Sequence, residues 1–111
     1  MRTKFIFPML AVTVLHSPWV QANPGWTEYV TVAELSPTAR HYYEVRLPVQ
    51  KNPSGCKDKT WFYQDYVVPG SDKMFNTLLE AVKSGIRVRV YVTGSCNLDG
   101  YSEIAAVSVI P

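Results

Sequence analysis

Two segments of this chain alternate apolar and polar residues, and this alternation constrains the fold more than any other feature. Within residues 41–47 and again within 86–92, every second side chain is apolar or aromatic. Successive side chains of a strand point to opposite faces, so a period of two predicts strands with one buried face each. The expected inward sets are Tyr43, Val45 and Leu47 in the first segment and Ile86, Val88, Val90 and Val92 in the second.

Three further segments are rich in β-branched and aromatic residues, namely residues 28–35, 60–68 and 101–110. Turn residues such as Pro48 and Gly70 lie between these segments. We therefore predict each of them as a strand, which gives five strands in all.

A single helix is predicted between the third and fourth strands. Ser71 is expected to cap its start, and Gly85 is expected to close its end. Apolar residues recur between them at the spacing of one helix face: Met74, Phe75, Leu78, Leu79 and Val82. The predicted fold is mainly β with one helix, in the order strand, strand, strand, helix, strand, strand.

This order resembles the OB-fold, a five-stranded, partly open Greek-key barrel. The run from Leu78 to Gly85, the alternating strand that follows it and Gly94-Ser95-Cys96 resemble small exported bacterial OB-fold proteins. That group is similar in topology to the pentameric, glycan-binding B subunits of AB5 toxins. The resemblance implies a single OB-like domain over residues 23–111 that acts in binding or in the assembly of a ring.

Residues 1–22 have the layout of a secretory signal peptide. A basic start precedes the uncharged residues 5–20, and Ala22 lies where a signal peptidase would cut. The uncharged stretch has 16 residues, two of them prolines, whereas a membrane-spanning helix needs about 20 mainly apolar residues. We therefore expect cleavage rather than a membrane anchor, and an exported chain that is periplasmic or secreted.

The charge of residues 23–111 is balanced, with nine Lys and Arg against nine Asp and Glu. Binding to nucleic acid requires clustered positive charge, and so does a polybasic contact with a membrane surface. We therefore expect no nucleic-acid partner.

Two cysteines, Cys56 and Cys96, lie in the part that we expect to be exported. In an oxidising compartment an even number of cysteines indicates a disulfide, whereas two free thiols are the alternative. Each cysteine flanks a predicted strand, so a small barrel would bring the two together. We predict that they are bonded.

Catalytic machinery is not visible in the sequence. His41 is the only histidine after residue 22, and a zinc site needs three or four ligands. Asp58 and Asp65 lie seven residues apart with nothing that marks them as a catalytic pair. We therefore predict no catalytic residues, no metal and no cofactor, and a protein that is not an enzyme.

Aromatic density beside arginine is the one positive functional signal. If Phe62 points inward, Trp61 and Tyr63 point outward, and the fourth strand presents its polar residues on the same side. Exposed aromatic rings beside arginine can stack on sugars or on another chain, although ordinary cross-strand pairing is the alternative explanation. The candidate ligand-binding residues are Trp61, Tyr63, Arg87, Arg89 and Tyr91.

The function that we expect is that of a small exported, non-catalytic binding module. Its ligand would be a glycan, a peptide or another small ligand, and a protein partner is also possible. The alternative is an assembly or structural subunit, an oligomer that resembles a toxin B-subunit ring.

Overall fold

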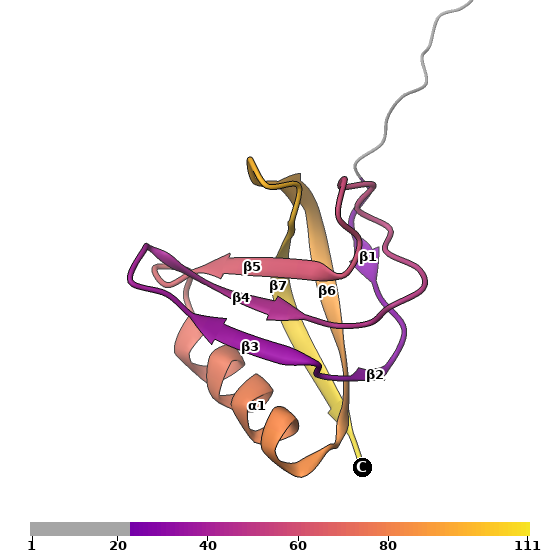
Figure 1. The fold of residues 1–111 in the computed structure, drawn as a ribbon, viewed down its shortest axis with the longest axis vertical. Helices are drawn as coiled ribbons and strands as arrows, with labels where there is room; N and C mark the ends of the chain where they lie inside the picture. The colour runs from indigo at the N-terminus through magenta and orange to yellow at the C-terminus, as the bar shows by residue number, and fades with distance from the viewer. Residues whose placement is uncertain (1–22) are drawn as a thin grey trace, which may run out of the picture.

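The computed structural model describes residues 23–111, a mainly β structure with one helix (Figure 1). The predicted signal peptide, residues 1–22, lies outside the described residues. The elements of the described part are β1 (Gly25–Trp26), β2 (Val30–Thr31), β3 (Glu34–Pro37), β4 (Tyr42–Arg46), β5 (Trp61–Asp65), α1 (Ser71–Ser84), β6 (Arg87–Cys96) and β7 (Ser102–Ile110).

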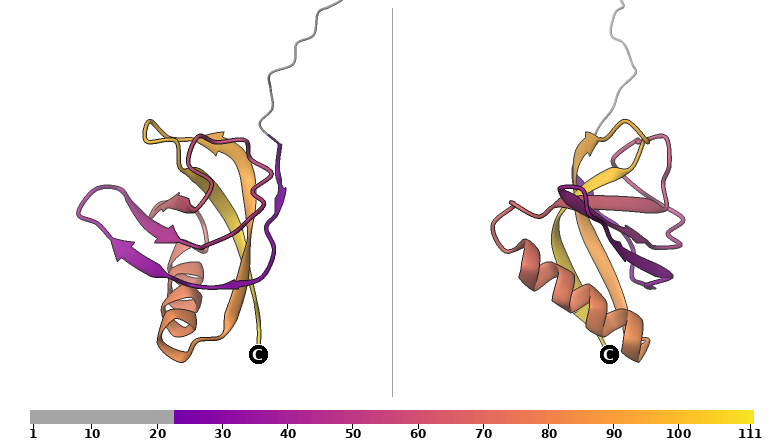
Figure 2. Two further views of the ribbon diagram at one scale, coloured as in Figure 1. Left: turned by 45° about the vertical axis from the view of Figure 1, so that its right-hand side comes forward. Right: turned by 60° about the vertical axis from the view of Figure 1, so that its left-hand side comes forward.

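The strands form one sheet with the order β1-β6-β7-β5-β4-β3, and β2 also pairs with β6. Every ladder is antiparallel except the short one between β5 and β7. The sheet folds over on itself, because β3, β4 and β5 cross β6 and β7 at a steep angle (Figures 1 and 2). The strands β1, β2 and β3 follow one another in the chain but pair at opposite ends of the sheet. The first two pair with β6, and β3 pairs with β4.

The prediction of one strand over residues 28–35 is wrong, because this segment changes partners midway. Val30 pairs with Val88 of β6, whereas Leu35 pairs with Val45 of β4. The chain crosses between the two partners at Val32, which is buried. A single period of two cannot describe a segment that turns from one part of the sheet to another.

The inward faces predicted by alternation are confirmed for both strict segments. The side chains of Tyr43, Val45 and Leu47 are buried, as are those of Val88, Val90 and Val92, whereas Ile86 is only partly buried. One polar pair lies among them, because the Tyr43 hydroxyl donates to Gln64 Oε1 at 2.9 Å. Gln64 Nε2 donates in turn to the Ile104 carbonyl oxygen at 2.9 Å, so both buried polar side chains are hydrogen-bonded.

Helix α1 packs against β3, β6 and β7 at one end of the curved sheet (Figure 2). Gly85 closes it in a left-handed conformation with φ of 76°, as predicted. Ser71, however, is the first helical residue rather than the cap, because Gly70 occupies the cap position with φ of 83° and no side-chain hydrogen bond. No helix within residues 23–111 has both the length and the apolar character needed to cross a membrane.

The apolar stripe of α1 is narrower than its sequence spacing predicts. Leu78 and Ala81 are fully buried against the core, with Phe75 and Val82 partly buried beside them. Leu79 is 38% exposed and lies at the edge of this face. The stripe therefore centres on Leu78.

Candidate ligand-binding face

The outer face of β4 and β5, extended by the start of β7, carries three rows of side chains. Strand pairing sets Arg46 opposite Trp61, Glu44 opposite Tyr63, and Tyr42 opposite Asp65. The parallel ladder to β7 places Glu103 beside Tyr63. Aromatic rings and carboxylates therefore alternate across this surface.

Two aromatic pairs organise the face. Trp61 and Tyr101 are stacked, with ring centroids 5.6 Å apart and an interplanar angle of 17°. Tyr42 and Tyr63 meet edge to face at 6.0 Å. Phe62 is buried while Trp61 and Tyr63 are partly exposed, so the inward and outward register predicted for this strand is confirmed.

A cleft of about 500 Å³ lies at the Tyr42 end of this face, and of these four rings Tyr42 lines it. One wall is the segment from Arg40 to Tyr42, which leads into β4, and the other is the loop from Cys96 to Asp99 between β6 and β7. The cleft lies within the size range of sites that hold small molecules or short oligomers. Its walls supply a guanidinium, an imidazole, an amide, a carboxylate and a phenol.

The loop wall is held by its own hydrogen bonds. Asn97 Oδ1 accepts from the backbone N–H groups of Asp99 and Tyr101, both at 3.0 Å. Gly100 is buried with φ of 84°, and a Cβ there would approach Lys57 to 2.8 Å, so only glycine fits. These contacts within the chain fix the shape of the loop, which favours a preorganised wall.

The predicted disulfide anchors the same loop. Cys56 and Cys96 are bonded, with their Cα atoms 5.7 Å apart. The backbone N–H of Asp58 also donates to the Gly100 carbonyl oxygen at 3.0 Å. Together these links tie the loop at residues 96–100 to the segment that precedes β5.

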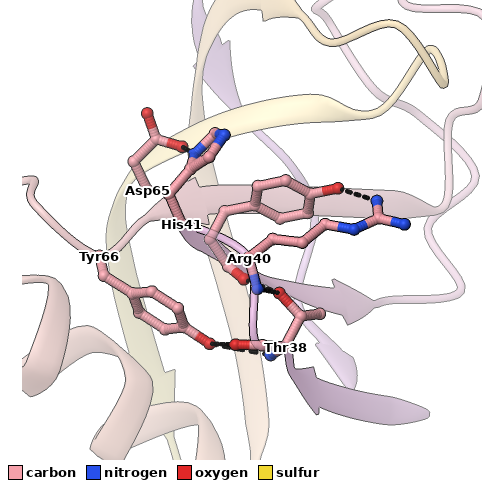
Figure 3. Close-up of polar contacts among 6 residues, drawn as sticks. Thr38, Arg40, His41, Asp65 and Tyr66 are labelled. Atoms are coloured by element: carbon pink, nitrogen blue, oxygen red, sulfur yellow. Dashed lines mark hydrogen bonds and ion pairs between the residues drawn. The ribbon is translucent and has the colours of Figure 1, made fainter.

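The polar residues at the start of β4 hold one another in place (Figure 3). An Arg40 guanidinium nitrogen, Nη1, donates to the Tyr42 hydroxyl at 2.7 Å, and this bond is the largest cause that raises the pKa of Arg40. His41 Nδ1 lies 3.2 Å from the Asp65 carboxylate and is largely exposed. The Tyr66 hydroxyl bonds both the N–H and the carbonyl oxygen of Thr38 at 2.8 Å (Figure 3).

Two of the three tyrosines of this face, Tyr63 and Tyr101, lie near several carboxylates. Burial is the first cause that raises the pKa of Tyr101, and the carboxylates of Glu44, Asp99 and Asp58 add to it. Burial likewise raises the pKa of Tyr63, followed by the effect of Glu103 and Asp65. Both phenols therefore stay protonated at neutral pH and are available as hydrogen-bond donors.

The residues predicted on the fourth strand do not join this face. On β6, Arg89 places its guanidinium 4.4 Å from the centroid of the Trp26 ring and 5.0 Å from that of Tyr29. Tyr91 meets the same Trp26 ring edge on at 5.5 Å. Arg87 is exposed and lies opposite Thr31 of β2. The contacts of Arg89 and Tyr91 with Trp26 and Tyr29 attach the N-terminal segment to β6.

The predicted set therefore falls into two separate groups. On β7, Glu103 lies beside Tyr63, whereas Ser108 lies opposite Arg89. Five residues of strand separate these two positions by about 16 Å. The expectation that Trp61, Tyr63 and the arginines of β6 form one surface is not met.

Sequence reasoning missed the cleft residues because they come from loops. Arg40 lies just before β4, and Asn97 and Asp99 lie in the β6–β7 loop. Asp99-Gly100 marks a turn in the sequence, but no local pattern brings that turn to the start of β4. Only the pairing of distant strands does so.

A second, smaller cavity of about 270 Å³ lies at the start of α1. Its walls are the rings of Pro37, Tyr66 and Phe75, with Ser71, Asp72 and Asn76 beside them. We favour the larger cleft as the candidate site because it adds a guanidinium and an imidazole to the carboxylate, amide and phenol that both sites have. Within residues 23–111 no group of three His, Cys, Asp or Glu side chains is placed to hold a metal ion.

No known protein family, no curated protein and no solved structure matches this chain.

Proposed function

We propose that this protein is a non-catalytic binding module that holds a short glycan in the cleft between residues 40–42 and 96–99. The observation that carries the proposal is a cleft lined by polar side chains and the Tyr42 ring, next to strand rows that carry further aromatic rings. Sugar rings stack their C–H faces on aromatic rings, while their hydroxyls bond carboxylates, amides and guanidinium groups. The cleft walls and the adjacent rows of β4 and β5 supply all of these groups.

The finer architecture that we propose is an OB-type barrel. The three short strands β1, β2 and β3 would together be its bent first strand. Their pairing at both ends of the sheet supports this assignment. In this barrel type the ligand face is formed by the second and third strands and by the loops between strands one and two and between four and five. The cleft is lined by those two loops and by the strand ends beside them, Tyr42 of β4 and Cys96 of β6, which supports both parts of the proposal.

Export is proposed together with this function. The layout of residues 1–22 supports it, and a disulfide between Cys56 and Cys96 suits an oxidising compartment. A periplasmic or secreted module of this size would meet glycans of the cell envelope or of other cells.

The test is a glycan array followed by titration of the best ligand with variants. Replacing Arg40 and Asp99 together by Ala should weaken binding at least about tenfold while leaving the melting temperature nearly unchanged, because both side chains are exposed. The matched control replaces Lys83 and Glu80 of α1, which also removes one charge of each sign from exposed positions. Equal loss in both variants, or a blank array, would contradict the proposal.

The alternative is a subunit that assembles through a strand edge. One observation favours it: β7 pairs with β5 only at Ser102 and Glu103, although it continues to Ile110 beside β6. A free edge of this kind can pair with another chain. The mass in solution decides between the two, since a ring-forming subunit would have a several-fold larger mass than the single chain.

A further inference from the structure

The charges around the cleft do not balance, although the described chain as a whole is neutral. Glu44, Asp65 and Glu103 lie on the rows beside the aromatic rings, and Asp99 lines the cleft itself. The basic side chains of the cleft walls and of the strand rows are Arg40 and Arg46, and Lys57 lies behind Gly100 of the cleft loop. With Asp58, which also acts on Tyr101, carboxylates therefore outnumber basic Lys and Arg side chains by five to three within residues 23–111.

Both guanidinium groups are already engaged. Arg46 lies 4.0 Å from the Glu34 carboxylate of β3, which adds a sixth acid at the border of this face. Arg40 donates to the Tyr42 hydroxyl at 2.7 Å. The exposed His41 imidazole lies against Asp65. Arg40, Arg46 and His41 therefore each have a partner within residues 23–111.

The surroundings of the Tyr101 hydroxyl show the same excess of carboxylates at the centre of the face. Glu44, Asp99 and Asp58 all act on Tyr101 in the direction that raises its pKa, after the larger effect of burial. Glu44 and Asp99 also contribute to raising the pKa of Arg40, after the larger effect of its hydrogen bond to the Tyr42 hydroxyl. These two carboxylates therefore lie near both the cation of the cleft and the stacked Trp61–Tyr101 pair.

From this arrangement we infer that the cleft selects by charge: it accepts neutral or amino sugars and excludes glycans whose terminal residue carries a carboxylate, phosphate or sulfate. Glu44 and Asp99 are the specificity-determining residues. They accept hydrogen bonds from sugar hydroxyls or from an ammonium group, and they repel an anionic substituent that would otherwise bind Arg40. This inference rests on the proposed glycan-binding function and adds the ligand class.

The experiment uses matched glycans on one array: the same oligosaccharide ending in a neutral sugar, in an amino sugar with a free amine, and in a sialic or uronic acid. Neutral or amino forms should be the best ligands, with the acidic forms at least about tenfold weaker. Neutralising the acids with Glu44→Gln and Asp99→Asn should reduce that ratio to near one. The control Glu80→Gln with Asp72→Asn makes the same chemical changes on α1 and should keep the ratio of the unmodified protein.

The possible results distinguish the charge selection from the glycan-binding function itself. Acidic glycans as the best ligands, or a ratio that survives neutralisation of Glu44 and Asp99 in a protein with an unchanged melting temperature, would overturn the charge selection and leave glycan binding in place. Failure of every form to bind would overturn the proposed function, and the charge selection with it.

Discussion

A buried hydrogen bond joins Tyr43 of β4 to Gln64 of β5 within a mainly apolar core. Burial is the main cause that raises the pKa of Tyr43 above its usual value of 10.0. The folded protein therefore keeps this proton at a pH where the unfolded chain releases it. Stability from this group is complete below pH 10 and declines as the pH rises from there toward the higher folded pKa.

We therefore predict alkaline destabilisation that depends on Tyr43. The free energy of unfolding, measured by urea titration at a series of pH values, should decrease above pH 10 by up to about 1.4 kcal/mol per pH unit from this residue. Tyr43→Phe should lower stability at neutral pH by about 1–3 kcal/mol, because Gln64 Oε1 loses its donor. The same variant should have a shallower alkaline decline, and an unchanged slope would contradict the assignment.

The guanidinium of Arg89 lies between the rings of Trp26 and Tyr29 and joins β6 to the segment that precedes β3. Arg89→Ala should destabilise the protein by about 1–3 kcal/mol, since two cation–π contacts and the packing of the side-chain stem are lost. Arg87→Ala is the matched control on the same strand, and its exposed side chain predicts a change below about 0.5 kcal/mol. Chemical denaturation followed by tryptophan fluorescence measures both, and equal effects would rule out the structural role of Arg89.

Helix α1 offers a comparison between two neighbouring leucines. Leu78 is fully buried, whereas Leu79 is 38% exposed. Leu78→Ala should cost about 2–5 kcal/mol, as expected for a cavity in a packed core, and Leu79→Ala should cost less than about 1 kcal/mol. Thermal or chemical denaturation tests this, and similar losses at both positions would show that the helix packs in a different rotation.

The sequence predicted best those elements in which one face stays buried along the whole length. The segment 86–92 alternates because β1, β2 and β7 all pair with β6 while one face stays buried. The segment 28–35 has two partners, so its pattern predicted a strand but not the break at Val32. Ser71 resembled a helix cap, but a capping role depends on the backbone of Gly70, which the sequence pattern does not specify.

The candidate site was predictable only in part, for a related reason. Alternation correctly separated Phe62 from Trp61 and Tyr63, since that choice is local to one strand. The distance between Tyr63 and Arg89 depends on the order of β5, β7 and β6 in the sheet, which no local pattern contains. Arg40 and Asp99 meet at one cleft for the same non-local reason.

The disulfide connects two loops and is predicted to be a large part of the stability of a domain this small. Its loop spans 40 residues, which corresponds to about 4 kcal/mol in the chain-entropy model. The oxidised protein should gain two hydrogens in intact mass on reduction, and its urea midpoint should fall. An unchanged mass would show free thiols, and an unchanged midpoint would show that the bond adds no stability.

At the scale of the whole molecule, the N-terminal segment completes the sheet. Trp26 pairs with Tyr91 and Val30 pairs with Val88, so this segment covers the outer edge of β6. Between them Thr27 is buried: its N–H donates to the Val90 carbonyl oxygen at 2.9 Å, and its hydroxyl accepts from the Val90 N–H at 3.1 Å. The described fold therefore depends on residues that begin at Gly25.

This arrangement gives a prediction about where the chain can be cut. Cleavage after Ala22 leaves every pairing of β1 and β2 in place, because the exposed residues Asn23 and Pro24 precede the first strand. A chain that begins at Asn23 should therefore have the same melting temperature as the purified full chain. A chain that begins at Val32 would expose the edge of β6 and lose the Thr27 hydrogen bonds, so it should unfold or aggregate. Circular dichroism and light scattering of the two truncated proteins test this, and a folded, monomeric protein beginning at Val32 would show that the N-terminal segment is dispensable. The intact mass of the protein produced in an exporting host tests the proposed cleavage after Ala22.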